Sequence, residues 1–319
     1  MDTPEFWYKK SFLSKALYPL SAAYLLTRKC DEWFSRPEIP DLPSIAIGGI
    51  TVGGAGKTPI ALSLYKIIES TGYCPFIISR GYRGKLSGIH VKRTDNFKDV
   101  GDEPLMLTEM GCDVFVDQNK LVAARRAKQL GANALIFDDS LQSTSIKAHV
   151  NLLVIDGAQG FGNEKLLPAG PLRESMKQVL KRTDAVVILG EDEQGIRITI
   201  PPKIPVFTAK AVTTVSVTGQ ALAFCGLGFP EKFFDALKSL GVNLVETRAF
   251  PDHYCYKEND LEALVNRSVN LKAQLVTTRK DLVRIPSRFH ECLSIADLDV
   301  AWDDQKSLTD FIKNRLKGL

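Results

Sequence analysis

The stretch ITVGGAGKTP, at residues 50–59, indicates the fold of the chain. An apolar run leads into it and a helical pattern follows it, which is the context in which Gly-Lys-Thr binds phosphate. Glycines let backbone N–H groups turn toward anionic oxygens, and the start of a helix adds a positive dipole end. Lys57 is expected to reach the β- and γ-phosphates of a nucleotide, and the Thr58 hydroxyl suits Mg²⁺. The predicted nucleotide-binding residues are Thr51, Val52, Gly53, Gly54, Ala55, Gly56, Lys57 and Thr58.

The match to the phosphate-loop pattern is incomplete. The pattern G-x-x-x-x-G-K-[ST] would place glycine at the position of Thr51. A glycine-rich turn with an unrelated Lys-Thr pair is the alternative, and the strand and helix on either side argue against it. Pro59 falls in the first turn of the predicted helix, where a missing N–H group costs little.

The rest of the chain alternates short apolar runs with helical stretches. Runs too continuous for a half-exposed sheet, separated by helices, favour a parallel sheet covered on both faces. We therefore predict an α/β fold of the P-loop NTPase type, with a mainly parallel sheet and helices on both faces. The predicted strands are 44–50, 74–80, 112–116, 134–139, 150–156 and 185–190, and the predicted helices include 57–70, 103–110 and 119–130.

A second lobe is predicted after residue 212. Residues 196–220 are rich in Thr, Val and Pro without helical periodicity, which indicates extended strands that connect two lobes. A new series of strands and helices then begins, with strands at 221–228 and 273–278, a helix that stops at Gly241, and a terminal helix at 304–316. We predict a P-loop kinase domain at 37–212 and a smaller α/β lobe at 213–319.

The first 36 residues form an amphipathic segment. Apolar residues recur in it at helical spacing with lysines and arginines around them, and Pro19 is expected to kink or divide the helix. One interpretation is a helix that packs on the domain. The other is an interfacial helix pair on an anionic membrane surface, favoured by aromatic residues at both ends, and the two are compatible.

The bulk composition excludes several classes of protein. A net charge of +4, from 41 basic and 37 acidic residues, with no basic tract, argues against a nucleic-acid partner. The six cysteines form no C-x-x-C pair, so neither a redox pair nor a zinc site is predicted, and a reducing compartment is favoured. No run approaches the ~20 apolar residues of a membrane-spanning helix, and no secretory signal is recognised.

An acidic strand end supplies the expected metal site. The run ALIFDDS, at residues 134–140, ends a predicted strand in Asp138 and Asp139. A hydrophobic strand followed by acid is the Walker B arrangement, so these carboxylates and Thr58 are the predicted Mg²⁺ ligands. A strand that ends in an ordinary turn is the alternative, since aspartate is common in turns.

Two further segments carry candidate catalytic groups. Asp102 lies in a turn before a predicted helix, and His253 lies beside aromatic residues; a carboxylate oriented by an imidazole can accept a hydroxyl proton. From chemistry alone, Asp102 is equally a helix N-cap and His253 a packing residue. The long loop at 160–175 carries Arg173 and Glu174, and loops of that length are often functional.

With these pieces in order, the chain resembles the tetraacyldisaccharide 4'-kinases of lipid A biosynthesis over nearly its whole length. The motifs that carry the resemblance are ITVGGAGKTP, ISRGYRG, VGDEP, DDSLQ, GFGNEKLLPAGPLRES, AFCGLGFPEKFF, FPDHY and TRKDLVRI, in the family's order. The resemblance implies transfer of the γ-phosphate of ATP to the 4'-hydroxyl of a tetraacylated glucosamine disaccharide 1-phosphate. It also implies a peripheral enzyme at the cytoplasmic face of the bacterial inner membrane, and no stable protein partner is predicted.

The resemblance also implies roles for particular residues. Asp102 would be the general base, oriented by His253, and Glu174 would be a further active-site acid whose role stays open between metal and substrate. The chain departs from the family where Ser140 replaces a glycine and Ser143 stands at the position of a histidine. The family's late Glu-Lys-Asp is Arg-Lys-Asp here, at residues 279–281.

Two other functions remain open from the sequence. One is a P-loop ATPase or GTPase switch without a lipid acceptor, although the N/T-K-x-D signature of guanine selection is absent. The other is a soluble small-molecule kinase in which the first helices dock a protein.

Overall fold

The computed structural model describes residues 4–9 and 11–317. Residues 1–3, 10, 318 and 319, which fall in the predicted first and last segments, lie outside the described residues. The strands are β1 Ser44–Gly49, β2 Pro75–Ser79, β3 Ile89–His90, β4 Val114–Val116, β5 Ala134–Phe137, β6 Val150–Asp156, β7 Ala185–Leu189, β8 Val206–Thr214, β9 Gln220–Cys225, β10 Asn243–Ala249, β11 Gln274–Thr278 and β12 Leu293–Trp302.

Helices alternate with these strands, as the sequence predicted. They are η1 Glu5–Trp7, α1 Phe12–Ala16, α2 Tyr18–Phe34, α3 Lys57–Ser70, α4 Phe97–Val100, α5 Asp102–Glu109, α6 Lys120–Gln129, α7 Met176–Arg182, α8 Ile196–Thr199, α9 Pro230–Ser239, α10 Glu258–Leu271, α11 Arg279–Leu282, η2 Ser287–Cys292 and α12 Gln305–Leu316.

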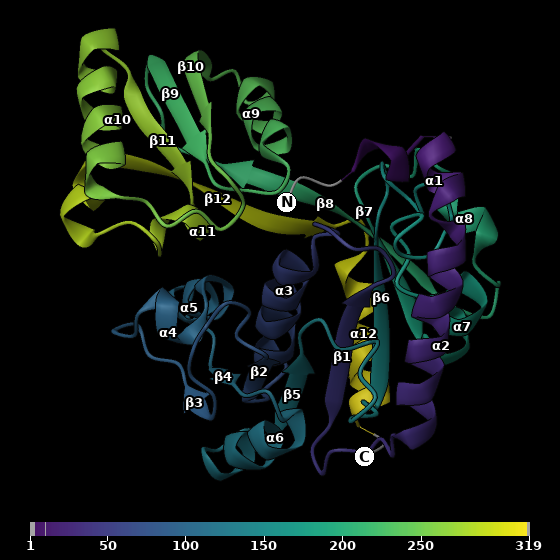
Figure 1. Cartoon of the computed structure of the whole chain (residues 1–319). Helices are drawn as coiled ribbons and strands as arrows, with labels where there is room; N and C mark the ends of the chain where they lie inside the picture. The colour runs from purple at the N-terminus through teal and green to yellow at the C-terminus, as the bar shows by residue number, and fades with distance from the viewer. Residues whose placement is uncertain (1–3, 10, 318–319) are drawn as a thin grey trace.

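The described strands form one sheet that runs through two lobes (Figure 1). Its order is β10-β9-β11-β12-β8-β7-β6-β1-β5-β2-β4-β3. Neighbours are parallel except for β12 with β8 and β3 with β4, so the predicted mainly parallel sheet is confirmed. β12 pairs with β11 through Leu293 to Ala296 and then with β8 through Asp297 to Trp302, which joins the two lobes.

Both faces of the first lobe are covered. Alternate residues of β1 point to opposite sides, because Ile45 and Ile47 pack with α3 and α12 whereas Ala46 packs with α6. The side chains of β6 also alternate between the two faces of the sheet, and those of Leu153 and Ile155 pack with α7 and α8. The predicted helices on both faces are therefore confirmed. In the second lobe, α9 and α10 cover opposite faces (Figure 1).

Two sequence expectations are corrected here. Residues 196–199, predicted to be extended, form α8, because the Asp192 carboxylate accepts hydrogen bonds from the N–H groups of Ile196 and Arg197 and Ile196 is buried. The last helix, assigned to the second lobe, packs in the core of the first lobe through Leu308, Ile312 and Leu316.

The N-terminal segment forms two helices separated at Leu17, with Pro19 in the first turn of the second, as its position predicted. These two helices, together with the short helix η1 before them, dock on the loop at 160–175 through hydrogen bonds from side chains to backbone carbonyls. The donors are Trp7, Ser14, Ser21, Tyr24 and Arg28. Within the described residues, no helix is both long and apolar enough to cross a bilayer.

Candidate active site

The phosphate loop lies between β1 and α3. Gly53 and Gly56 have φ values of 118° and 75°, in the region that favours glycine. A Cβ atom at Gly56 would also lie only 2.1 Å from Cδ2 of Leu189. Both glycines are therefore required by a turn whose N–H groups precede the start of a helix, where an anion is stabilised.

The residues before these glycines pair with the loop at 160–175. Thr51 is buried and forms an antiparallel bridge with Leu172. The N–H of Val52 donates to the carbonyl of Pro171, at 2.9 Å. A β-branched residue fits an extended, paired position, which is a physical reason for threonine where the usual pattern has glycine. The N–H of Val52, a residue predicted to bind nucleotide, is thus already engaged in a backbone hydrogen bond.

The acidic strand end lies beside this loop, because β5 is the neighbour of β1. Nζ of Lys57 is 3.6 Å from Oδ1 of Asp139, and Arg173 donates to both oxygens of that carboxylate, at 3.0 and 3.1 Å. Burial, followed by the charges of Glu103 and Asp139, raises the pKa of Asp138 to about 6. Burial acts in the same direction on Asp139, but Lys57 and Arg173 outweigh it and lower the pKa of that carboxyl.

This set of residues fits Mg²⁺. Burial, and secondarily the carboxylates of Glu103 and Asp139, raise the pKa of Asp138, so a bound cation would stabilise its ionised form. With the Thr58 hydroxyl, the donors are all oxygen, the type that Mg²⁺ prefers. No group of three or more His, Cys, Asp and Glu side chains in the described part of the chain is placed to hold a metal. A site with only two carboxylates suits Mg²⁺, because this ion usually keeps several waters and binds substrate phosphates as its remaining ligands.

A buried lysine supports the acidic pair, and it was not predicted from the sequence. Lys120, at the start of α6, is 1% exposed. Its ammonium donates to the carbonyls of Asp138 and Asp139, at 3.3 and 3.4 Å, and to the hydroxyl of Ser140. Burial, followed by the charge of Arg80, lowers the pKa of Lys120 to about 8. Ser140, which departs from the glycine expected there, completes the three acceptors that an ammonium can use.

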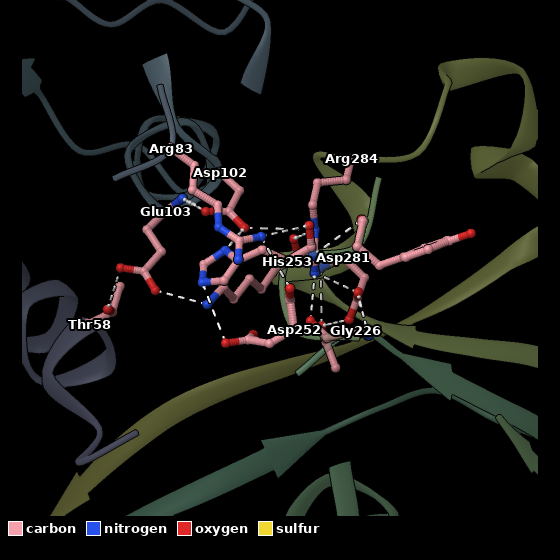
Figure 2. Close-up of polar contacts among 12 residues, drawn as sticks. Thr58, Arg83, Asp102, Glu103, Gly226, Asp252, His253, Asp281 and Arg284 are labelled. Carbon is pink, nitrogen blue, oxygen red and sulfur yellow. Dashed lines mark hydrogen bonds and ion pairs between the residues drawn. The ribbon is translucent and has the colours of Figure 1, made fainter. Parts of the chain in front are cut away.

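Asp102 and His253 meet across the two lobes (Figure 2). Nδ1 of His253 lies 2.6 Å from Oδ2 of Asp102, and both side chains are largely buried. Burial alone would raise the pKa of Asp102. The hydrogen bond from His253 and the positive charges of Lys280, His253 and Arg284 outweigh burial, so the pKa is lowered. An ionised carboxylate oriented by an imidazole is the arrangement that a general base requires.

Glu103, the next residue, connects the dyad to the phosphate loop. Its carboxylate accepts from the Thr58 hydroxyl, at 3.3 Å, and from the Lys280 ammonium, at 2.9 Å (Figure 2). Thr58 lies in the first turn of α3 and Lys280 lies on α11 of the second lobe. Neither contact was predicted, since each joins segments far apart in the sequence.

Arg83 holds the turn that carries His253. Its guanidinium donates to the carbonyl of Asp252 at 3.2 Å and to that of His253 at 3.4 Å (Figure 2). The ring of Tyr82 meets the imidazole edge-on, with centroids 5.5 Å apart. The ISRGYRG and FPDHY motifs are therefore neighbours in space.

Glu174 lies apart from these groups. It is 2% exposed, forms an ion pair with Arg182 and lies 4.0 Å from Arg28, which ties it to α7 and α2. Its Oε2 atom has no hydrogen-bond partner among the described residues. The side chain from this loop that reaches the acidic pair is Arg173, its neighbour.

Comparisons with known proteins identify the family. The family model described as tetraacyldisaccharide-1-P 4'-kinase (LpxK) matches residues 13–317. The tetraacyldisaccharide 4'-kinase of Rhodospirillum rubrum is 36% identical over 331 residues and covers 100% of this chain and 99% of the relative. That of Paramagnetospirillum magneticum is 36% identical and covers 97% of each. The solved LpxK of Aquifex aeolicus in complex with ATP shares the fold, with a TM-score of 0.77, 24% identity and coverage of 96% and 100%. The chain belongs to the tetraacyldisaccharide-1-P 4'-kinase family.

Proposed function

We infer that this chain is an ATP-dependent kinase that transfers the γ-phosphate to the 4'-hydroxyl of a tetraacylated glucosamine disaccharide 1-phosphate. The observation that carries the inference is the buried contact between Asp102 and His253, next to a phosphate loop. Because Glu103 contacts Thr58, the candidate base adjoins the loop that would hold the γ-phosphate. A switch ATPase needs no such base for an alcohol acceptor, and no comparison supports one.

The residues divide the reaction between them. Asp102 accepts the proton of the acceptor 4'-hydroxyl while the oxygen of that hydroxyl attacks the γ-phosphorus. The bond between the γ-phosphorus and the bridging oxygen of the β-phosphate breaks, which releases ADP. His253 holds the carboxylate in place. A carboxylate with a lowered pKa is a weak base, which suits a loose transition state in which little bond to the acceptor has formed.

The phosphate loop supplies the remaining stabilisation. Lys57 and the N–H groups around Gly53 and Gly56 would bind the phosphates. Thr58, Asp138 and Asp139 are the residues proposed to hold Mg²⁺, which when bound neutralises charge on the β- and γ-phosphates. Arg173 and Lys57 keep Asp139 ionised for that purpose.

One assay separates the kinase from the switch. The protein is incubated with ATP labelled at the γ-phosphate and with a tetraacyldisaccharide 1-phosphate, and the lipid is then extracted. We expect label in the lipid fraction. Label found only as free phosphate, at the same rate with and without lipid, would contradict the proposed function.

We also propose that the enzyme works on the cytoplasmic membrane surface, where its lipid acceptor and ATP meet. Four large apolar side chains of the N-terminal helices support this: Phe12, Leu20, Trp33 and Phe34 are 55–85% exposed. Exposed Lys15 and Lys29 lie on the same helices and suit an anionic surface. The hydrogen bonds that dock these helices come from other residues, so an apolar surface remains uncovered.

Substitution tests this better than deletion, because deletion would also remove the hydrogen bonds to the loop at 160–175. The variant with Phe12→Ser, Leu20→Ser, Trp33→Ser and Phe34→Ser is compared with Val269→Ser, an exposed apolar residue of the other lobe. The affinity for vesicles of phosphatidylglycerol and phosphatidylethanolamine should fall at least tenfold in the first variant, since burial of one apolar side chain contributes about 1.5–3 kcal/mol. Equal vesicle binding by both variants would contradict the membrane role.

A further inference from the structure

A buried ion pair lies beside the turn that carries His253 (Figure 2). Asp281 and Arg284 are 0% and 3% exposed, and their side chains are 2.6 Å apart. The carboxylate of Asp281 is fixed by hydrogen bonds from four donors, three to Oδ1 and one to Oδ2. These donors are the Gly226 N–H at 2.8 Å, the Tyr256 hydroxyl at 2.6 Å, the Thr278 hydroxyl at 2.5 Å and the Arg284 guanidinium.

Arg284 in turn contacts the residue after His253 and the glycine to which the His253 backbone is hydrogen-bonded. It donates to the carbonyl of Gly226 at 3.2 Å and to that of Tyr254 at 3.3 Å. The Gly226 carbonyl also accepts from the N–H of His253, at 3.2 Å. His253 has a φ of 58°, which is unfavourable for a residue with a side chain and needs support from its surroundings.

The same guanidinium lies close to the base. Nε of Arg284 is 3.8 Å from Oδ2 of Asp102, the oxygen that faces His253. Stability alone does not account for such a pair, because replacing a buried ion pair with apolar residues is often neutral or stabilising. Besides its pair with Asp281 and a hydrogen bond to the Lys280 carbonyl, Arg284 contacts Asp102 and the backbone that holds the His253 turn.

We infer that Arg284, oriented by Asp281, is a positioning residue for phosphoryl transfer: it fixes the His253 turn against Asp102 and places a second positive charge beside that carboxylate. The inference rests on the proposed function, in which Asp102 is the base. The planar guanidinium holds the His253 turn by hydrogen bonds, and its positive charge acts on Asp102. Substitution can separate the two roles, because lysine keeps the charge but not the planar geometry.

The pH dependence follows from the charges around Asp102. Positive charge lowers the pKa of a carboxyl group, so removal of the Arg284 charge raises it. On acidification, a variant without the Arg284 charge should therefore lose the activity that depends on ionised Asp102 at a higher pH than the parent enzyme does. The charged groups around Asp102 are His253 and Asp252 on the turn, Lys280 on α11, Arg284 just after α11, Glu103 on α5 and Arg83 on its loop.

The test compares Arg284→Lys and Arg284→Met with Arg288→Met, an exposed arginine of the same lobe that pairs with Glu258. We expect Arg284→Met to lower kcat about 10²-fold, the scale of a misplaced catalytic group. The acid limb of its kcat/KM profile should move to higher pH, while the KM for ATP stays the same. Arg284→Lys should restore the acid limb without restoring kcat, and Arg288→Met should match the parent enzyme.

Two further measurements keep the inference testable. Because loss of Arg284 leaves a buried carboxylate unpaired, the double variant Asp281→Asn, Arg284→Met is assayed as well, and it should show the same kinetic losses. Nitrogen-15 spectra of the His253 ring, assigned with His253→Asn, report the contact with Asp102 without any lipid substrate. An unchanged acid limb and an unchanged His253 spectrum in Arg284→Met would overturn the inference, whereas absence of lipid phosphorylation by the parent enzyme would overturn the proposed function.

Discussion

The groups that would bind phosphate and those that would activate the acceptor are built in different ways. The phosphate half, Gly53 to Thr58 with Asp138 and Asp139, comes from the ends of two neighbouring strands of one sheet. The base half, Asp102 with His253, joins residues 151 positions apart, on two lobes. The first half is therefore set by local structure, and the second exists only while the lobes are held together.

This difference gives the two halves separate failure modes. A change in the phosphate half should affect ATP itself, whether or not an acceptor is present. A change in the base half should leave ATP binding intact and remove transfer. Variants in each half, assayed both for ATP binding and for phosphate transfer, test whether that separation holds.

The largest effect is expected at Asp102. Asp102→Asn keeps the shape of the side chain but removes the proton acceptor, so kcat for the lipid should fall by up to about 10⁴-fold. Equilibrium binding of an ATP analogue should not change, because the phosphate half is untouched. Turnover within a few-fold of the parent enzyme would rule out the assigned base.

Lys57→Met should lower kcat by about 10²–10³-fold, the usual cost of removing one electrostatic group from a transition state. Unlike the previous variant, it should also weaken binding of the ATP analogue, measured by calorimetry. Lys66→Met, further along the same helix, is the matched control because Lys66 is exposed and pairs with Asp299 at the surface. Loss of turnover with unchanged ATP affinity would break the proposed separation of the two halves.

The lowered pKa of Lys120 should make the stability of the protein depend on pH. Its pKa is lowered to about 8 in the folded protein, so the unfolded chain binds its proton more tightly. Between about pH 8 and its unfolded value near 10.4, the unfolded chain holds more protons and the folded state gains stability as pH rises, by up to about 3 kcal/mol.

The pH dependence of the free energy of unfolding is measured by urea unfolding at several pH values. Three proteins are compared: the parent, Lys120→Met and Lys128→Met. Lys128 lies on the same helix and is half exposed. The gain in the free energy of unfolding should disappear in Lys120→Met alone. Identical pH slopes in all three proteins would show that Lys120 is not held in the way described.

The smallest effect is expected at the connection between the halves. Lys280→Met removes the contact to Glu103 but leaves the dyad and the phosphate loop in place. A partly buried ion pair of this kind is expected to change kcat/KM about tenfold. The change should diminish at high salt, and a loss as large as that of Asp102→Asn would mean that Lys280 itself takes part in the chemistry.

The phosphate half could be predicted from the sequence because its chemistry is contiguous. A strand, a glycine turn and Lys-Thr stand in one stretch, and the acidic pair directly ends another strand. The contact of Asp102 with His253 could be expected only through family resemblance, since spacing in the sequence holds no information on which loops meet. Glu103, Lys280 and Arg284 were missed for the same reason.

The fold shows a similar division. Continuous apolar runs such as those of β1 and β6 are buried on both faces and were correctly predicted as strands. β10 and β12 were not predicted, because they are half exposed and carry charged residues between apolar ones. Thr51 has its explanation only in the pairing with Leu172, which no local pattern reveals.

The return of α12 to the first lobe has a consequence for synthesis. Leu308, Ile312 and Leu316 are almost fully buried in the core that also holds β1 and α3, and each contributes about 1.5–3 kcal/mol. The ribosome makes these residues after the whole second lobe. The nucleotide-binding lobe, although it begins earlier in the sequence, therefore cannot complete its core until α12 has been synthesised. A nascent chain that stops before α12 leaves the apolar side chains of that core without the helix that covers them.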